Sequence, residues 1–374
     1  MASIAKRPDG RWRARYKAPD GRWRAQHFDR KTDAQSFLDG IASQVITGSY
    51  VAPERGKLTV AEWADKWLAG KVSLKPSTAA TYKSIVKHHI KPRWERVALA
   101  DVAHEDVGEW VGDLHGAGLS ASRTRQVHTI FAAMLDAAVR SHRLAANPAR
   151  GVELPRLPAL KHRYLAHAEV AALADACGEY GTLIRVLSYG GLRFGEAAAL
   201  RAKNVDVLRA RVTIAESVCE IGGRLAFTAP KTHAVRTISL PRTVADLLAV
   251  ELADKGPDDL VFQSPRGDVL REGNWRRDVF DAAAARIGQP GLTPHALRHT
   301  AASLAISAGA HVVAVSRLLG HASPNVTLGV YSHLFENDLD DVAARLDNAA
   351  ASVRGTNEGL NVVALEGQRD RRAG

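Results

Sequence analysis

The chain has 374 residues, 46% of them hydrophobic and 24% charged, which predicts two or three domains with buried cores and excludes wholesale disorder. No apolar run approaches the roughly 18–20 residues of a membrane span, and the polar, basic start lacks the apolar segment of a secretory signal, so we expect a cytoplasmic protein. A formal net charge of +11 at pH 7 favours a polyanionic partner, nucleic acid ahead of an anionic membrane surface.

The first 31 residues hold ten Lys or Arg against three Asp, a net charge of +7. Within them lies a repeat, DGRWRARYK at 9–17 and DGRWRAQHF at 20–28. Each copy alternates basic and bulky side chains after an Asp-Gly turn signal, which is typical of a half-buried strand. We expect a small three-stranded sheet with Trp12 and Trp23 on one face and the arginines on the other. A helix over 32–47 should cover it, capped by Thr32 or Asp33.

The arginines of this sheet are candidate DNA contacts. In a chain this basic, an exposed strand surface rich in Arg favours DNA over the alternative, a solvated charged face. The candidates are Arg11, Arg13, Arg15, Arg22 and Arg24.

Residues 48–57 and 148–158 break the periodic patterns and are predicted to be linkers. Between them the pattern is helical and predicts a four-helix module, whose first helix opens with a capping box formed by Thr59 and Glu62. Such a module suits binding across a duplex, although its exposed charges taken alone are more often solvated surface. The candidate DNA contacts here are Lys75, Lys83, Lys87, Arg123 and Arg125.

The remainder mixes helical segments with a few short strand-like ones, so the chain as a whole is predicted to be α+β and mostly helical. We expect domains at 1–55, 56–155 and 156–350, followed by a flexible tail at 351–374 that is polar and aperiodic. Cys177 and Cys219 match no metal-ligand spacing and are expected to be inert thiols.

Two segments of the third domain would suit phosphate binding. Gly190 and Gly191 can end one helix just before a new one, which leaves Arg193 beside a helix start. Thr293 and Pro294 are a good N-cap and first residue for another helix. His295 and Arg298 would then be adjacent on one face of its first turns. Zinc is a poor alternative for His295 and His299, because Ala296 stands where an HExxH protease needs Glu.

Two further positions gain meaning only from their order in the chain. Gly320 is predicted to end a helix just before His321, and Ser323-Pro324 to start the helix that carries Tyr331. A lone Tyr is usually a core residue, and a lone His after Gly usually lies in a loop.

Taken together, these segments resemble the tyrosine recombinases. The matching stretches are GGLRFGEA, PKTHAVRTI, TPHALRHTAAS, LLGHAS and VYSHL, in the family's order and across nearly all of 160–345. By position, the resemblance implies that Arg193 and Arg298 hold the scissile phosphate, Lys231 is the acid for the leaving 5′ oxygen, and Tyr331 is the nucleophile. His295 and His321 would assist by hydrogen bonding. Glu196 and His299 would support these residues from beside them, and His333 is expected on a helix surface.

The physical chemistry agrees with this interpretation. A phenol of pKa about 10 costs roughly 4 kcal/mol to ionise at pH 7, and guanidiniums and imidazoles around one phosphate offset much of that cost. A phosphotyrosine bond keeps the bond energy, so rejoining needs no ATP. The sequence has no carboxylate cluster that suggests a metal, and we expect no cofactor.

The basic repeat favours a phage-type integrase with an arm-binding amino-terminal domain, which integrates and excises a phage or other mobile element. A chromosome-dimer resolvase with the same chemistry and a catalytically inactive DNA-binding regulator are the alternatives. The expected partners are double-stranded DNA at core and arm attachment sites, DNA-bending proteins and excision-directionality proteins, with no membrane and a nucleoid-associated location in a bacterial host. Four protomers should act on paired sites through a Holliday junction, with Leu339, Val342 and Leu346 as candidates for docking onto a neighbour.

Overall fold

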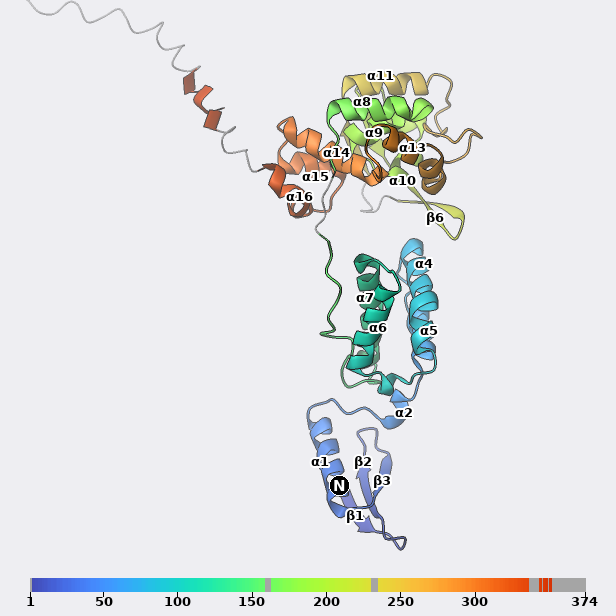
Figure 1. The fold of residues 1–374 in the computed structure, drawn as a ribbon, viewed down its shortest axis with the longest axis vertical. Helices are drawn as coiled ribbons and strands as arrows, with labels where there is room; N and C mark the ends of the chain where they lie inside the picture. The colour runs from blue at the N-terminus through green and yellow to red at the C-terminus, as the bar shows by residue number, and fades with distance from the viewer. Residues whose placement is uncertain are drawn as a thin grey trace, which may run out of the picture. The chain divides into compact units, whose positions relative to one another are not determined.

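A computed structural model describes residues 2–158, 163–229 and 235–335, together with 343–344, 346–348 and 350–351 (Figure 1). Lys231, Leu339, Val342 and the tail from 352 onward lie outside the described residues. The chain divides into two compact units, Met1–Leu160 and Lys161–Gly374. The division lies close to the expected domain boundary after 155, while the boundary within the first unit stays a prediction.

The first unit begins with the predicted small sheet. Its strands β1 (Ala2–Lys6), β2 (Trp12–Lys17) and β3 (Trp23–Phe28) are antiparallel and lie in the order β1-β2-β3. Helix α1 (Lys31–Ile46) covers one face, where Ala14, Tyr16 and Leu38 form a small buried core. The helix begins after Arg30 with no side-chain cap, so the prediction of a Thr32 or Asp33 cap is wrong.

The two tryptophans of the repeat lie on opposite faces of this sheet. Cross-strand partners share a face, and the register pairs Trp12 with Phe28 but Trp23 with Lys17. Trp12 therefore points with Tyr16 toward α1, whereas Trp23 lies among the basic residues of the open face. The prediction that both tryptophans line one face is wrong, because the hairpin register, which the repeat does not specify, decides the parity of β3.

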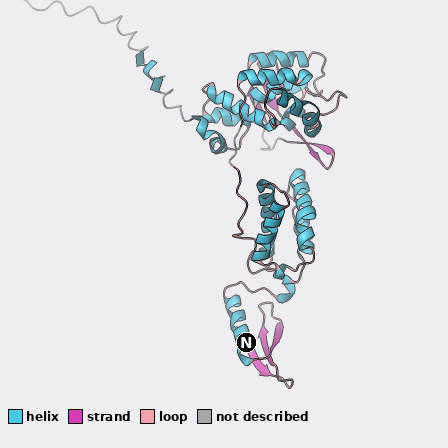
Figure 2. Ribbon diagram, viewed as in Figure 1, coloured by secondary structure: helices cyan, strands magenta, loops and turns pink. Residues whose placement is uncertain are grey.

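The rest of the first unit is the predicted four-helix module (Figure 2). After a short helix α2 (Pro53–Gly56), it consists of α3 (Val60–Ala69), α4 (Pro76–Ile85) continued by η1 (Val86–Ile90) and α5 (Lys91–Trp94), α6 (His104–Gly116) and α7 (Ala121–Arg140), with a 3-10 turn η2 (Leu99–Asp101) before α6. The capping box at Thr59 is confirmed: the Glu62 amide donates to the Thr59 hydroxyl at 3.2 Å, and the Thr59 amide donates to the Glu62 carboxylate at 2.9 Å. Four tryptophans and Phe131 fill the core.

The second unit begins with helices around two small antiparallel sheets. The helical elements are α8 (His167–Ala176), η3 (Gly178–Tyr180), α9 (Gly181–Gly190), α10 (Phe194–Ala198) and η4 (Ala202–Asn204). Strands β4 (Val205–Asp206), β5 (Arg211–Ile214) and β8 (Arg236–Ser239) form one sheet in that order, and β6 (Ser217–Ile221) pairs with β7 (Arg224–Thr228) as a hairpin.

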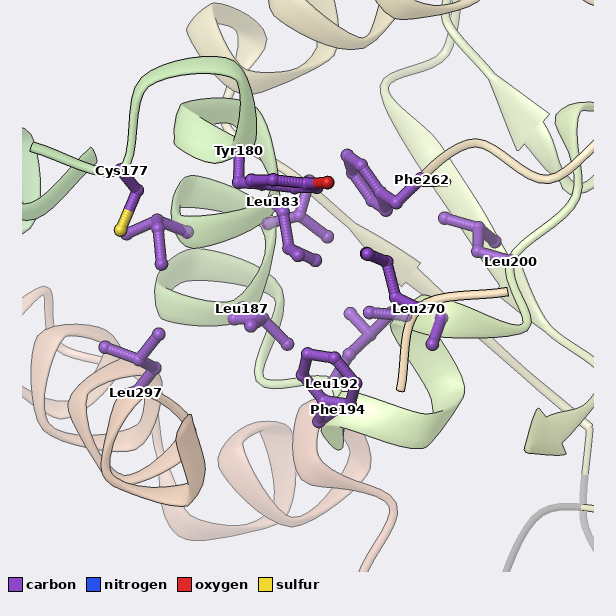
Figure 3. Close-up of a cluster of buried hydrophobic side chains, with 14 of the residues drawn as sticks. Cys177, Tyr180, Leu183, Leu187, Leu192, Phe194, Leu200, Phe262, Leu270 and Leu297 are labelled. Atoms are coloured by element: carbon purple, nitrogen blue, oxygen red, sulfur yellow. The ribbon is translucent and has the colours of Figure 1, made fainter. Parts of the chain in front are cut away.

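The later helices complete this unit and carry most of the motif residues. They are α11 (Arg242–Glu251), α12 (Glu272–Trp275), η5 (Arg276–Phe280), α13 (Asp281–Arg286), α14 (Pro294–Ser307), α15 (Val312–Leu319), α16 (Pro324–Tyr331) and η6 (Ser332–Phe335). Leu183 and Leu187 of α9 reach into a core shared with Phe262, Leu270 and Leu297 (Figure 3). That core holds α9 against α14, so the two motif-bearing segments meet.

Candidate active site

Arg193 is held where the chain passes from α9 to α10. Gly191 ends α9 in the left-handed conformation, with φ of 65°, which Gly adopts without steric cost. Arg193 then caps α10: its amide donates to Glu196 Oε2 at 3.0 Å and its Nη1 donates to Oε1 at 2.8 Å. Glu196 therefore holds both the backbone and the guanidinium of Arg193, the supporting position expected of it.

Arg298 approaches the same turn from α14. Thr293 caps this helix as predicted, accepting from the Ala296 amide at 3.3 Å. The Arg298 side chain is buried, and its Nη1 donates to the Gly191 carbonyl at 2.5 Å. Its Nη2 is buried with no hydrogen-bond partner among the described residues. Burial, and then the charge of Arg193, lower the pKa of Arg298 to about 9. The guanidiniums of Arg193 and Arg298 thus both lie at the turn between α9 and α10, where a bound anion would accept their hydrogen bonds.

A third guanidinium, that of Arg236, belongs to this cluster and was missed by sequence reasoning. Arg236 donates to both oxygens of Glu196, from Nη1 at 3.1 Å and from Nη2 at 2.6 Å. Burial acts to raise the pKa of Glu196, but the hydrogen bonds and charges of Arg236 and Arg193 hold that pKa below its usual value. Three guanidiniums now face one carboxylate, an excess of two positive charges.

A signal for Arg236 was present in the sequence. In a strand, residues i, i+2 and i+4 share a face, so Arg236 lies on the same face as Ile238 and Leu240, both of which are buried. A charged residue at an inward position needs a buried partner of opposite sign. The strand pattern alone would have predicted such a partner, although not that it is Glu196.

His321 follows the end of α15, which Gly320 terminates with φ of 64°. A Cβ on Gly320 would lie 2.8 Å from Cδ, Nε and Cζ of Arg236, so the turn packs directly on that side chain. His321 Nδ1 lies 2.8 Å from the Thr327 hydroxyl. Burial, and then the charges of Arg298 and Arg193, lower the pKa of His321 to about 4, so its ring is neutral at pH 7.

Tyr331 ends α16 and is only 1% exposed. Its ring packs in a small cluster with Ala302, Ile306, Val315 and Leu319. Its hydroxyl lies 2.7 Å from Nδ1 of His299. Burial raises the pKa of Tyr331 to about 12, and the charge of Arg298 acts against that rise. The phenol is therefore a neutral acid within electrostatic reach of the arginine cluster.

The remaining motif histidines, His295 and His333, are both exposed and contact different partners. His295 lies on the exposed side of α14, and its ring centre is 4.9 Å from that of His299 in a T-shaped contact. His295 is also one of the groups that lower the pKa of His321. His333 is exposed, as expected, and its Nε2 lies 3.3 Å from the Tyr164 hydroxyl. The structure therefore brings together every predicted site residue of this unit that lies within the described ranges.

The basic residues expected on the amino-terminal sheet differ in their surroundings. Arg13 and Arg15 are exposed on the open face, where the Arg15 guanidinium lies 4.3 Å from the centre of the Trp23 ring. Arg22 is exposed in the hairpin loop, and Arg11 pairs with Asp29 at 3.2 Å. Arg24 lies on the face toward α1, with a side chain 13% exposed between Asp20 and Glu54. The expectation that Arg24 lies on the open face is wrong, again because of the register.

Among the basic residues of the four-helix module, Lys75, Lys83 and Lys87 are exposed, whereas Arg123 is partly buried and donates to Gln126 at 2.8 Å. Arg125 differs from the other four in its backbone partners. It is partly buried and donates to the carbonyls of Pro155 at 2.7 Å and Leu154 at 3.3 Å. The prediction of an exposed position for Arg125 is wrong, because this guanidinium holds the chain segment that follows the module.

Within the described ranges, no three His, Cys, Asp or Glu side chains form a group suited to a metal ion. No helix in this part of the chain is long and apolar enough to cross a membrane. Both cysteines are free thiols, and burial raises the pKa of Cys177 to about 11, which makes it a poor nucleophile.

Comparison with known proteins gives the same order of segments. The profile of the phage integrase family matches residues 163–338. The phage integrase N-terminal domain matches 2–47, and the phage integrase N-terminal SAM-like domain matches 59–115. The chain belongs to the phage integrase family. It is therefore a tyrosine recombinase family enzyme of site-specific DNA recombination.

Relatives of this integrase family cover most of the chain. The integrase of Mycobacterium phage L5 is 26% identical over 322 residues, covering 81% of this chain and 85% of the phage protein. The Tn1549 transposon integrase bound to transposon right end DNA has a similar fold, with a TM-score of 0.67, 19% identity and coverage of 78% of this chain and 100% of that one. The lambda integrase tetramer bound to a Holliday junction has a TM-score of 0.55 at 15% identity, with coverage of 86% of this chain and 96% of the lambda integrase chain.

Proposed function

We propose that this integrase cleaves and rejoins DNA at the attachment sites of a phage or other mobile element, with Tyr331 as the nucleophile. The observation that carries the proposal is the convergence of Arg193 and Arg298 on the Gly191 turn, with the Tyr331 hydroxyl within electrostatic reach of Arg298. An excess of two positive charges in a partly buried cluster needs an anion, and a phosphodiester supplies one.

The guanidiniums of Arg193 and Arg298 would bind the non-bridging oxygens of the scissile phosphate. Arginine suits this role because its planar fork meets two oxygens and stays protonated. The buried Nη2 of Arg298 gains a partner when the phosphate arrives. The pentacovalent transition state carries more negative charge than the ground state, so the cluster stabilises it more strongly. The imidazole rings of His295 and His321 would donate further hydrogen bonds to the same oxygens.

In the chemical step, the Tyr331 oxygen forms a bond to phosphorus and the bond from phosphorus to the 5′ oxygen breaks. The products are a 3′-phosphotyrosine and a 5′ hydroxyl, and the protonated Lys231 amine gives the 5′ oxygen its proton. Ionising a phenol of pKa about 12 at pH 7 costs roughly 7 kcal/mol. The arginine cluster and the bound phosphate must therefore organise loss of the tyrosine proton together with attack. Neither a metal nor ATP is needed for these steps.

The amino-terminal sheet favours an integrase over a chromosome-dimer resolvase, because the match to a phage integrase N-terminal domain covers 2–47. We propose that its open face, with Arg13, Arg15 and the exposed Trp23, binds arm-type DNA. The four-helix module would bind the core site through Lys75, Lys83, Lys87 and Arg123. Arg11 and Arg22 remain candidate arm contacts, whereas Arg24 and Arg125 have the internal partners described above.

Each chain has one candidate nucleophile, and exchange between two duplexes requires four strands to be cut. Four protomers on two paired sites, acting through a Holliday junction, would meet this requirement, and the lambda integrase tetramer bound to a Holliday junction has a similar fold. The segment 336–350 would dock onto a neighbouring protomer. DNA-bending and excision-directionality proteins would join this assembly.

Tyr331→Phe tests the chemistry. The variant removes one oxygen and no positive charge, so it should bind core DNA like the wild type and form no covalent adduct with a nicked suicide substrate on a denaturing gel. An adduct that persists in the Phe variant would assign the nucleophile to another residue. The wild-type enzyme should keep its cleavage rate in EDTA, and a loss there would contradict the metal-free mechanism. A wild type that binds but never cleaves would identify an inactive regulator.

Deletion of residues 1–55 tests the domain assignment. The truncated protein should bind and cleave core DNA but lose integration that depends on arm sites. Because the arginines of the sheet would displace counterions from DNA, the full-length protein should lose arm affinity more steeply with salt than the truncated one. Gel-shift titrations on core and arm DNA at several salt concentrations measure this. Equal binding of arm DNA by the two proteins would favour the resolvase.

A further inference from the structure

The hydroxyl of Tyr331 has a nearby proton acceptor, His299. Its Nδ1 lies 2.7 Å from the phenol oxygen, a short hydrogen-bond distance, and the two rings meet at a tilt with centroids 5.7 Å apart. His299 is the residue directly after Arg298 on α14, a helix that also packs against η6. The attacking oxygen therefore shares a hydrogen bond with an imidazole to which the resemblance assigns only a supporting role.

The burial of Tyr331 makes this contact chemically important. The ring is 1% exposed and is enclosed by aliphatic side chains, so bulk water has little access to its hydroxyl. The proton must leave as the oxygen attacks phosphorus, and efficient transfer requires an acceptor within about 2.6–3.2 Å. His299 meets that geometric condition before DNA is bound.

The other imidazoles near the site are less suited to the task. His321 has its Nδ1 occupied by the Thr327 hydroxyl at 2.8 Å, and its pKa of about 4 makes it a weak base at neutral pH. His295 lies on the exposed side of α14, with His299 between it and Tyr331 in the series of ring contacts. Among the described residues, His299 is the one whose ring hydrogen-bonds to the phenol.

We propose that His299 is a catalytic residue, the general base that accepts the Tyr331 proton during DNA cleavage. The proposal rests on the proposed function, in which Tyr331 is the nucleophile. It assigns the neutral imidazole an unprotonated Nδ1 in the resting enzyme, so that the hydroxyl donates and the ring accepts.

The Tyr331 O–H bond breaks as its oxygen bonds to phosphorus, and the proton moves to Nδ1 of His299, which becomes an imidazolium. The bond from phosphorus to the 5′ oxygen breaks, and that oxygen takes a proton from the acid assigned to Lys231. In rejoining, the 5′ hydroxyl returns its proton to that amine while the imidazolium returns its proton to Tyr331. No proton is consumed over the cycle.

Several titratable and charged groups surround this pair. His295 and Arg298 lie on the same helix, Tyr164 lies close enough to affect Tyr331, and His333 follows on η6. Helices α9 and α15 also pack on α14. Of their ionisable groups, Arg185 is paired with Asp175, Tyr189 contacts His167, and Arg317 is exposed. These groups are unchanged in the His299 variants, so they are common to every pH profile that is compared.

His299→Asn and His299→Ala separate proton transfer from positioning. The Asn oxygen falls near the place of Nδ1 and can accept a hydrogen bond, but it takes up no proton in this pH range. Single-turnover cleavage of a suicide substrate at pH 7.5 should fall about 100-fold in both variants, a typical loss for general base catalysis. A near-wild-type rate in the Asn variant would overturn the proposal and leave His299 a positioning residue. A faster rate in either variant would also overturn it, as evidence that His299 restrains the nucleophile.

Two further readouts sharpen the test. Without the base, the reaction needs tyrosinate, so the cleavage rate of the Asn variant should rise about tenfold per pH unit up to pH 9, whereas the wild type levels off. A substrate with sulfur at the bridging 5′ position releases a thiolate that needs no proton. It should rescue Lys231→Ala but not His299→Asn; rescue of the latter would place His299 on the leaving-group side and overturn the proposal.

The controls distinguish this inference from the proposed function. His333→Asn alters a nearby exposed imidazole and should cleave like the wild type. Equal DNA binding and equal thermal unfolding of the His299 variants and wild type would exclude misfolding. If the wild type itself forms no adduct, the proposed function fails; if the wild type cleaves and His299→Asn matches it, only the role of His299 fails.

Discussion

Arg236 donates hydrogen bonds to both oxygens of the buried Glu196 carboxylate, at 3.1 Å and 2.6 Å, and Glu196 in turn holds Arg193. Arg236 thus determines how much of the Glu196 charge is left to neutralise Arg193. With Arg236 in place, one carboxylate is shared between two guanidiniums, and Arg193 keeps most of its attraction for a phosphate.

Arg236→Gln should destabilise the protein by about 3 kcal/mol, because it leaves a buried carboxylate with one partner fewer. Cleavage should also fall by about tenfold or more, since Glu196 then pairs with Arg193 alone. Chemical denaturation and single-turnover cleavage measure the two effects. Arg277→Gln is a matched control: Arg277 pairs with Asp278 at 2.7 Å on the surface, and its loss should cost less than about 1 kcal/mol. Equal effects of the two substitutions would contradict the role of Arg236.

The stability difference between wild type and Arg236→Gln should depend on pH. The folded-state pKa of Glu196 lies below its usual value, mainly because hydrogen bonds from Arg236 and Arg193 outweigh the effect of burial. Its contribution is therefore present above the unfolded pKa, near 4.3, and is lost as pH falls through the folded pKa. The difference in unfolding free energy should be largest near pH 7 and smallest in acid. A constant difference from pH 7 to pH 3 would count against the ion pair.

Gly320→Ala should displace Arg236, because the new Cβ would lie 2.8 Å from three atoms of that side chain. We expect about 1–2 kcal/mol of backbone strain from the positive φ and a further loss of about 1–3 kcal/mol from overpacking. Gly288→Ala is the control for backbone strain, since Gly288 has φ of 73° and nothing within 4 Å of an added Cβ. Cleavage should fall in the first variant and stay unchanged in the second.

Arg298→Met should abolish cleavage while raising the stability of the DNA-free protein by about 1 kcal/mol or more. Burial and the charge of Arg193 lower the pKa of Arg298 to about 9, so the guanidinium is charged below that pH and its burial there destabilises the folded state. Replacing a buried, under-paired ion by an apolar side chain of similar volume is often stabilising. Thermal unfolding without DNA measures this, and a clear decrease in stability would show that the bond to Gly191 outweighs burial of the charge.

His321→Asn should make stability less sensitive to acid. The folded pKa of His321 is about 4, against an unfolded value of about 6.5, because burial and neighbouring arginines disfavour its protonated form. As pH falls from 6.5 to 4, the unfolded wild type binds a proton that the folded state does not, so the wild type loses stability across that window. Urea midpoints at pH 7, 5.5 and 4.5 should converge on, or cross, those of the Asn variant. Parallel curves would contradict the depressed pKa.

The open face of the amino-terminal sheet can be tested without truncation. Arg13→Gln and Arg15→Gln should each weaken binding of arm DNA and reduce the salt dependence of log affinity by about one unit of slope. Arg24→Gln, on the opposite face, should leave that slope unchanged, because its guanidinium is already paired with Asp20 and Glu54. Gel shifts from low to moderate salt measure the slopes. Identical slopes for all three variants would remove the open face as the binding surface.

The sequence alone determined two helix caps and the order of the motif residues along the chain. The capping box at Thr59 and the cap at Thr293 follow from hydrogen bonds within one helical turn, so neighbouring residues specify them. The spacing of His295 and Arg298 places both on one side of α14 by helix geometry. The motif order from Arg193 to Tyr331 predicted the family, and the helical and strand-like patterns predicted the mostly helical α+β fold.

The tertiary structure decided which side chains meet across elements. The register of Lys17 with Trp23 reversed the expected face of Trp23 and turned Arg24 inward, because one residue of strand offset moves a side chain to the other face. Arg125 donates to the Pro155 carbonyl, 30 positions away in the chain, and this contact also depends on the tertiary structure. The contacts of Arg236 with Glu196 and of His299 with Tyr331 join residues 40 and 32 positions apart. Such contacts arise when α10 meets β8 and α14 meets α16, and no local pattern encodes them.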